Sequence, residues 1–301
     1  MTGGFADDQT MVVLGTATPG GGFPLYGAAY CATLNEFDRT LAVEPRHTKG
    51  STENIPLLEA GKIDLGLATG EVTYEALAGV GRAPADLRIL SAMYPNSGLF
   101  VVRADSPHRA IADLRGQSIA WGARGSGFVV LARYVFDGLA LDLDRDFRPT
   151  YLDQAADGPA MVLDGRAAAL WGGGIGWPGF VAVANGPAGA RFIAPSAAEI
   201  QRVIAKYSFI KPITLPAGSY PGQDSPIAAL GSWSLVLARP SLPDEIAYRL
   251  ARALHAGEAT LGARLAQARE STLANTLAAA PRQDLIHLGV LRYMRDAGML
   301  R

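Results

Sequence analysis

Short apolar runs alternate with helix-like stretches along almost the whole chain. Runs such as residues 11–14, 63–68 and 233–238 are bounded by glycine or polar residues and have the length of buried strands. Between them, apolar residues recur at the spacing of one helix face. This alternation predicts an α/β protein with mainly parallel sheets.

The same pattern locates the remaining elements. Further strands are expected at 87–92, 99–103, 118–121, 147–152, 167–171 and 191–194. Helices are expected at 25–37, from 51 to Gly61, and at 111–116, 128–137, 158–165, 196–207, 243–262 and 282–298.

Three segments, 14–24, 47–68 and 118–127, share one device: a glycine turn and hydroxyl side chains beside the start of a helix. In the second, Gly50 forms the turn and Ser51 or Thr52 can cap the helix. The N-terminus of a helix presents unpaired N–H groups and a partial positive charge, which suits a small anion. Three such units predict helix ends that converge on one small ligand.

The chain contains no fixed short repeat and no low-complexity linker, so two lobes are expected to join through strands. Crossings are placed near 101–104 and 215–220. Residues 1–103 with 219–301 would form the first lobe, and 104–218 an inserted second lobe.

Charge and composition bear on which partners and which cellular environment to expect. The net charge of −1 gives no reason to expect nucleic acid or an anionic membrane as partner. The single cysteine, Cys31, excludes an intramolecular disulfide, and its apolar surroundings predict a buried thiol. No apolar run approaches the roughly 20 residues of a membrane span. Residues 1–8 show no signal-peptide pattern, so an exported native protein would already have lost its signal.

Several sequence blocks together resemble the TAXI solute receptors, the substrate-binding subunits of one branch of tripartite ATP-independent periplasmic (TRAP) transporters. They are Thr16-Ala-Thr-Pro-Gly-Gly-Gly-Phe23, Lys49-Gly-Ser-Thr-Glu-Asn54 with Gly61-Lys-Ile-Asp64, Gly122-Ala-Arg-Gly-Ser-Gly127, Pro216-Ala-Gly-Ser-Tyr-Pro-Gly222 and the ending 287–298.

The resemblance implies a type II periplasmic-binding-protein fold: two α/β lobes around a ligand cleft, joined by hinge strands. It implies an exported, periplasmic, monomeric receptor without catalytic activity, cofactor or metal. Such a receptor would deliver a small organic acid to TRAP transporter membrane subunits. The acid could be an amino acid, a dicarboxylate or oxoacid, or an aromatic acid.

Two departures from the family pattern bear on the ligand. The family usually has threonine where Gly22 and Phe128 stand, at helix starts that point into the cleft. Losing two hydroxyls favours a less polar carboxylate, with a ring or a branch.

Candidate carboxylate partners are Arg124, whose guanidinium fork fits a carboxylate, Lys49 and Arg46; each could instead be a solvated loop cation. Trp171 could form a cleft wall or belong to the core. The full set of ligand-binding candidates is Thr18, Gly22, Phe23, Lys49, Ser51, Asn54, Glu71, Tyr94, Arg124, Ser126, Gly127 and Trp171.

Other sequence motifs lack residues that their usual functions require. The phosphate-loop pattern starting at Gly15 lacks the Lys-Ser or Lys-Thr pair, and the dinucleotide-like 174–179 contains Pro178. The four histidines have no metal-ligand spacing. An enzyme or a ligand-sensing domain on the same bilobal scaffold remains the alternative.

Overall fold

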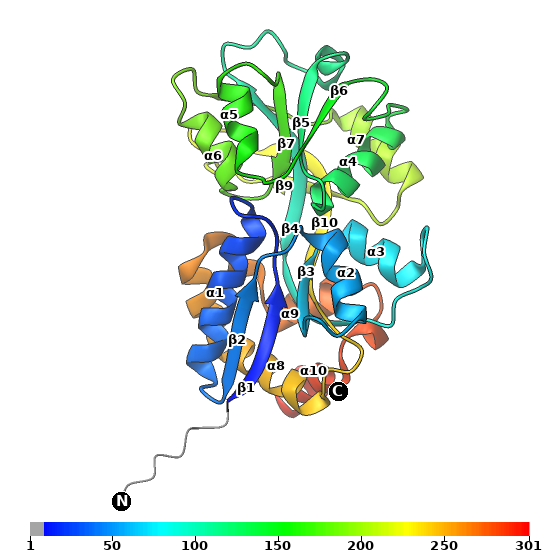
Figure 1. The fold of residues 1–301 in the computed structure, drawn as a ribbon, viewed down its shortest axis with the longest axis vertical. Helices are drawn as coiled ribbons and strands as arrows, with labels where there is room; N and C mark the ends of the chain where they lie inside the picture. The colour runs from blue at the N-terminus through cyan, green and yellow to red at the C-terminus, as the bar shows by residue number, and fades with distance from the viewer. Residues whose placement is uncertain (1–8, 301) are drawn as a thin grey trace, which may run out of the picture.

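The computed structural model describes residues 9–300, and Figure 1 shows two α/β lobes, one above the other in that view. Two long strands, β4 (Arg88–Arg103) and β10 (Ile227–Ala238), run from one lobe into the other. The expected bilobal α/β architecture with connecting strands is therefore confirmed. The prediction about the N-terminal segment concerns residues 1–8, which lie outside the described residues.

The first lobe contains both ends of the described chain. Its N-terminal elements are β1 (Thr10–Gly15), α1 (Gly22–Phe37), β2 (Leu41–Arg46), α2 (Ser51–Glu59), β3 (Leu65–Ala68) and α3 (Gly70–Ala78). Its C-terminal elements are α8 (Asp244–Arg264), η2 (Ala266–Glu270), α9 (Leu273–Ala279), η3 (Gln283–Leu285) and α10 (Leu288–Asp296).

The second lobe is built from the middle of the chain. Its elements are η1 (Ile111–Leu114), β5 (Ser118–Ala123), α4 (Gly127–Gly138), β6 (Arg148–Leu152), α5 (Asp157–Leu163), β7 (Ala169–Gly173), α6 (Pro178–Ala184), β8 (Ala190–Ile193), α7 (Ala197–Lys206) and β9 (Lys211–Leu215).

All ten strands belong to one hydrogen-bonded sheet in the order β2-β1-β3-β10-β4-β7-β5-β6, with β9 beside β10 and β8 beside β4. The outer pairs are parallel, as expected. Every pair that involves β4 or β10 is antiparallel. The expectation of mainly parallel sheets is thus wrong at the centre, because the two crossing strands run in opposite directions and pair with each other.

The crossing strand β4 also corrects two predicted elements. Its 16 residues were expected as two strands, 87–92 and 99–103. The strand continues through Pro95 and Gly98, which pair with Trp233 and Leu230 of β10. Pairing with a neighbouring strand therefore outweighs the local preference of these residues. Helix α3 was not predicted at all, since its start looked like a polar turn.

Hydrophobic packing separates the lobes. One cluster joins β1–β3 and α1 to the C-terminal helices, and two clusters lie in the second lobe. Tyr220 packs in a second-lobe cluster, with its ring centroid 5.4 Å from that of Phe180 and 4.9 Å from that of Phe192. The domain boundaries stay a proposal, and this packing supports a second crossing within β10 rather than at 215–220.

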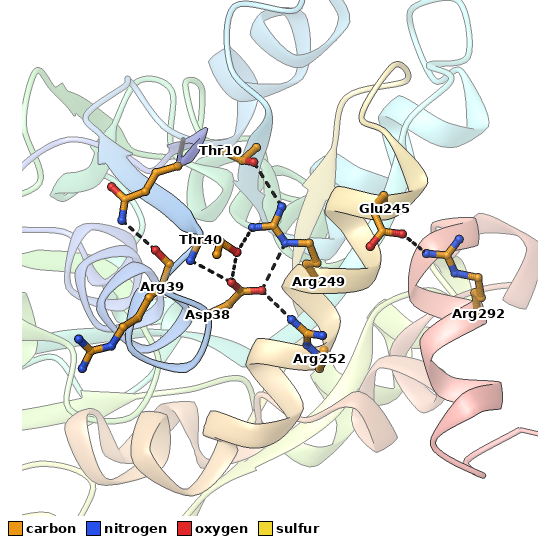
Figure 2. Close-up of polar contacts among 9 residues, drawn as sticks. Thr10, Asp38, Arg39, Thr40, Glu245, Arg249, Arg252 and Arg292 are labelled. Carbon is orange, nitrogen blue, oxygen red and sulfur yellow. Dashed lines mark hydrogen bonds and ion pairs between the residues drawn. The ribbon is translucent and has the colours of Figure 1, made fainter. Parts of the chain in front are cut away.

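A buried carboxylate ties the N-terminal part of the first lobe to α8 (Figure 2). Asp38, at the end of α1, accepts hydrogen bonds from Arg249 Nε (3.3 Å) and Arg252 Nη2 (2.9 Å) of α8. Arg249 also donates to the hydroxyls of Thr10 and Thr40. Burial alone would raise the pKa of Asp38, but the hydrogen bonds from Thr40 and Arg249 outweigh it and hold that pKa below its usual range.

Candidate functional site

A pocket lies between the lobes, where the helices begin at the ends of the strands. It is lined by residues of both lobes and by residues of the crossing strand β4. Its cavity volume is about 60 Å³. Since one water needs roughly 10–15 Å³ of such space, the pocket suits a small solute.

Four helices of nine or more residues start at this pocket, one more than expected, and Trp177 at the start of the seven-residue α6 also lines it. The lining includes Gly22 at the start of α1, Ser51 at the start of α2, Thr69 before α3, and Gly127 at the start of α4. Helices α1, α2 and α3 have no side-chain cap. The partial positive charge of each of these helix starts therefore lies at the pocket, although the Thr52 N–H of α2 already donates to the Gly125 carbonyl.

The local sequence explains why these helices start here. Gly50 precedes α2 with a φ of +115°, a conformation that side chains rarely adopt, and it replaces the predicted Ser51 or Thr52 cap. The Ser51 hydroxyl instead accepts a hydrogen bond from the Thr69 N–H at 3.2 Å. Ser126 caps α4 by accepting from the Phe128 N–H at 3.2 Å. The bond between Ser51 and Thr69 holds the starts of α2 and α3 side by side.

The two lobes touch along the edges of the pocket. The Gly125 carbonyl, in the second lobe, accepts hydrogen bonds from the Thr52 N–H (3.3 Å) and the Thr52 hydroxyl (3.1 Å). On the opposite side, the Ala155 N–H donates to Thr18 Oγ1 at 3.3 Å. The structure thus shows the cleft closed over the pocket.

The pocket has one end at α1 that carries neutral polar groups. The position that a Cβ would take at Gly22 lies 3.5 Å from the Trp177 ring, 3.7 Å from Tyr94 Oη and 4.0 Å from Gln267 Nε2. The corresponding position at Gly174 lies 3.3 Å from Asn96 Oδ1 and 3.8 Å from Gln267 Oε1. Burial raises the pKa of Tyr94, so its phenol stays neutral and can donate a hydrogen bond.

The opposite end lies where α2, α3 and α4 begin. A Cβ at Gly127 would lie 2.1 Å from Thr69 Oγ1, and one at Gly125 would lie 2.8 Å from Lys49 Cβ. Lys49 is the one lysine or arginine among the pocket-lining residues, within the described part of the chain. The cationic residue of the lining therefore lies at this end; Lys49 is exposed, and its backbone N–H donates to the Glu53 carboxylate at 2.6 Å.

Nine of the predicted site residues line the pocket. They are Thr18, Gly22, Phe23, Lys49, Ser51, Tyr94, Ser126, Gly127 and Trp171. Trp171 is also a core residue, only 1% exposed, with its Nε1 donating to the Phe128 carbonyl at 2.8 Å. Both interpretations of Trp171 are compatible with its position.

Three predicted residues do not line it. The exposed Arg124 points toward Tyr151, with its guanidinium carbon 5.7 Å from the ring centroid. Asn54 is fully buried and donates to the carbonyls of Gly15, Thr16 and Leu67, which fastens α2 to the ends of β1 and β3. Both expectations rested on proximity in sequence to a glycine turn.

Glu71, the third, is buried in the first turn of α3, two residues after the pocket-lining Thr69. Burial raises the pKa of its carboxyl, and the nearby hydroxyls of Ser232 and Thr69 only partly oppose this. Its two oxygens have no hydrogen-bond partner that meets geometric criteria within residues 9–300. Glu71 is therefore a buried carboxyl without a hydrogen-bond partner in the described residues, and it does not belong to the pocket lining.

Sequence reasoning missed Thr69, Asn96, Trp177 and Gln267, which all line the pocket. Thr69 and Trp177 each immediately precede a helix, a signal that could have been used. Asn96 lies inside β4, and Gln267 lies in η2, which packs against β4. No local pattern indicates that these two amides approach the cleft.

Solved structures share this architecture. MatC from Rhodopseudomonas palustris with bound malate is 13% identical with a TM-score of 0.62, covering 95% of this chain and 98% of that one. A TctC solute binding protein from Polaromonas is 14% identical with a TM-score of 0.52, covering 98% and 100%. The alkanesulfonate-binding protein SsuA from Xanthomonas axonopodis pv. citri, bound to MOPS, is 18% identical with a TM-score of 0.51, covering 98% and 94%.

The fold is therefore that of the periplasmic binding proteins, with a mixed α/β structure and two lobes around a cleft. The chain belongs to the NMT1-like family, whose model matches residues 14–298. None of the helices in residues 9–300 combines the length and hydropathy that a membrane span requires.

Proposed function

We propose that this protein is an exported solute receptor that captures a small organic acid in its cleft and acts without catalytic turnover. The observation that carries the proposal is the convergence of four helix N-termini, three of them without a side-chain cap, on one small pocket. Such ends stabilise an anion without a dedicated arginine. The structural neighbours described above, including one with bound malate, support a role in solute binding.

Closure of the cleft would distinguish the ligand-bound receptor from the empty one. Both lobes supply lining residues, so a ligand in the pocket contacts more of the protein when the cleft is closed. It then favours the closed form by its higher affinity for that form. We propose that the closed receptor is a periplasmic monomer that docks on the membrane subunits of a TRAP transporter, as the TAXI resemblance implies.

Ligand binding is tested by a thermal-shift screen followed by calorimetry. The panel holds amino acids, C4–C6 dicarboxylates, oxoacids and aromatic carboxylates, after the protein has been unfolded and refolded to remove any co-purified ligand. A raised melting temperature with one class of acid is expected, because a ligand of the native state stabilises it by mass action. The absence of a shift with every acid would contradict the proposal.

Two further measurements test its remaining parts. Recovery of the bound acid unchanged after prolonged incubation is expected of a receptor, whereas a product would favour an enzyme. Uptake by cells that carry the membrane subunits should require this protein and an ion gradient, and should persist when ATP is depleted at a constant gradient. Dependence on ATP would exclude the TRAP assignment.

A further inference from the structure

The two ends of the pocket differ in charge, and this difference bears on the class of ligand. At the end formed by α2, α3 and α4, three helices begin and Lys49 lies at the edge. At the α1 end lie the start of α1 and that of the seven-residue helix α6, which Trp177 precedes, together with the neutral side chains of Tyr94, Asn96 and Gln267. A ligand that spans the pocket therefore meets two chemically different environments.

Gln267 is the clearest sign that the α1 end binds a polar group. Its side chain is 7% exposed and lines the pocket, and its amide forms no hydrogen bond with other residues of the described chain. Because this amide faces the pocket without a protein partner, a ligand group that accepts from Nε2 and donates to Oε1 can take the place of water there. Asn96 already donates to Ser234 Oγ, which leaves its Oδ1 as a second acceptor near Gly174.

From this arrangement we propose that the pocket selects a monoanion with two unlike ends. Its carboxylate lies against the helix starts at Ser51, Thr69 and Gly127. A neutral group with both donor and acceptor atoms, such as a carboxamide or a hydroxyl, lies against Gln267. This inference rests on the proposed function and specifies its ligand.

The alternative occupant of the α1 end is a second carboxylate. The start of α1 would partly stabilise it, since Gly22 and Phe23 begin a helix without a side-chain cap. However, the acceptor oxygen of Asn96 lies at the same end, and no cationic side chain of the described residues lines the pocket there. Desolvation of a second charge is then poorly compensated.

The test compares pairs of acids that differ in one group. Succinate and succinamate, glutarate and glutaramate, and adipate and adipamate have the same chain lengths and heavy-atom counts within each pair. At pH 7.5, calorimetry should show that the amide member of the best-fitting pair binds about tenfold more tightly than the diacid, which corresponds to roughly 1.4 kcal/mol. Equal or tighter binding of the diacid overturns the inference.

A variant of Gln267 tests whether this residue causes the preference for the amide over the diacid. Gln267→Leu should weaken binding of the amide member at least about fivefold and leave the affinity for the diacid within about twofold, because only the neutral pair of hydrogen bonds is lost. Gln201→Leu, an equivalent change at an exposed position on α7, should leave both affinities unchanged. An unchanged ratio in Gln267→Leu also contradicts the inference.

The two proposals can fail separately. If no acid of either kind binds the wild-type protein, the proposed function is refuted and this inference with it. If diacids bind and outcompete the amides, the receptor function stands and only the assignment of the α1 end is wrong. The comparison of pairs in the wild-type protein keeps the test valid even if a variant does not fold.

Discussion

Closure of the cleft can be blocked with a single methyl group at Gly125. A Cβ at this position would lie 2.4 Å from the carbonyl oxygen, 2.8 Å from the carbonyl carbon and 2.8 Å from the Cβ of Lys49 in the other lobe. Two of these atoms belong to the backbone and cannot rotate away. Gly125 is not among the glycines with a positive φ, so alanine fits its own backbone conformation.

The expected penalty falls on the closed form alone. Overpacking of this kind costs about 1–3 kcal/mol, which weakens ligand binding roughly 5- to 150-fold. At a ligand concentration of 100 times the wild-type Kd, the wild-type protein gains about 2.7 kcal/mol. A variant with hundredfold weaker binding gains only about 0.4 kcal/mol at that concentration. With about 2–4 °C per kcal/mol, the ligand-induced shift falls from roughly 5–10 °C to about 1 °C.

The assay is a thermal shift of Gly125→Ala with the tightest acid of the panel, with and without ligand. Gly21→Ala is the matched control, because Gly21 lines the same pocket before a helix and its nearest atom to a Cβ is the Thr18 carbonyl oxygen at 3.3 Å. The ligand-free melting temperature should not fall in either variant. A full ligand-induced shift in Gly125→Ala would refute the reasoning that ligand binding requires this contact between the lobes.

Three further predictions concern stability and reactivity. Asp38→Asn should lower the free energy of unfolding by roughly 1–3 kcal/mol in urea titrations at pH 7, because it leaves Arg249 without its carboxylate. The pKa of Asp38 is lowered in the folded state, so its contribution to the free energy of unfolding is present above the pKa of the unfolded chain and is lost as pH falls below about 4. If wild type and variant lost the same free energy of unfolding between about pH 4 and pH 2, this reasoning would be contradicted. Burial lowers the pKa of His287, and its neutral ring accepts a hydrogen bond from the Gly289 N–H. The wild-type melting temperature should therefore fall as pH drops below about 6.5, and it should fall less in His287→Asn. Burial raises the pKa of the Cys31 thiol to about 12, so iodoacetamide should label it at pH 7.5 only after unfolding in guanidinium.

The elements that could be predicted from the sequence are those whose signals are local. Gly50 marked a turn because its backbone conformation excludes most residues, and the helix expected from residue 196 does begin there, with Ser196 as its N-cap. The start of α3 was missed because Thr69-Gly70-Glu71 has the composition of a turn, although it begins a helix. The central antiparallel pairing was missed because β4 and β10 are more than a hundred residues apart in the sequence.

The candidate site residues divide in the same way, into those with a local sequence signal and those that reach the pocket through tertiary contacts. Ser51, Ser126 and Gly127 follow from glycine turns, and they do line the pocket. Arg124 shares that sequence context, yet its side chain lies over Tyr151 instead. Gln267 reaches the pocket only because η2 packs against β4, a tertiary contact that composition and periodicity do not encode. Whether these residues bind the ligand stays a prediction.

The pairing of β4 with β10 restricts how the lobes can move. The two strands are hydrogen-bonded to each other in both lobes, at Leu230 with Gly98 and at Leu237 with Ile89, with register irregularities between. Sliding or rotating one lobe in the plane of this ribbon would break ladder hydrogen bonds, whereas bending the ribbon preserves them. Bending of the ribbon is therefore the motion that we expect to open the cleft, and one coordinate, the angle between the lobes, describes it. A single pair of fluorophores, one on α2 and one on α4, is enough to follow that coordinate in a single-molecule experiment.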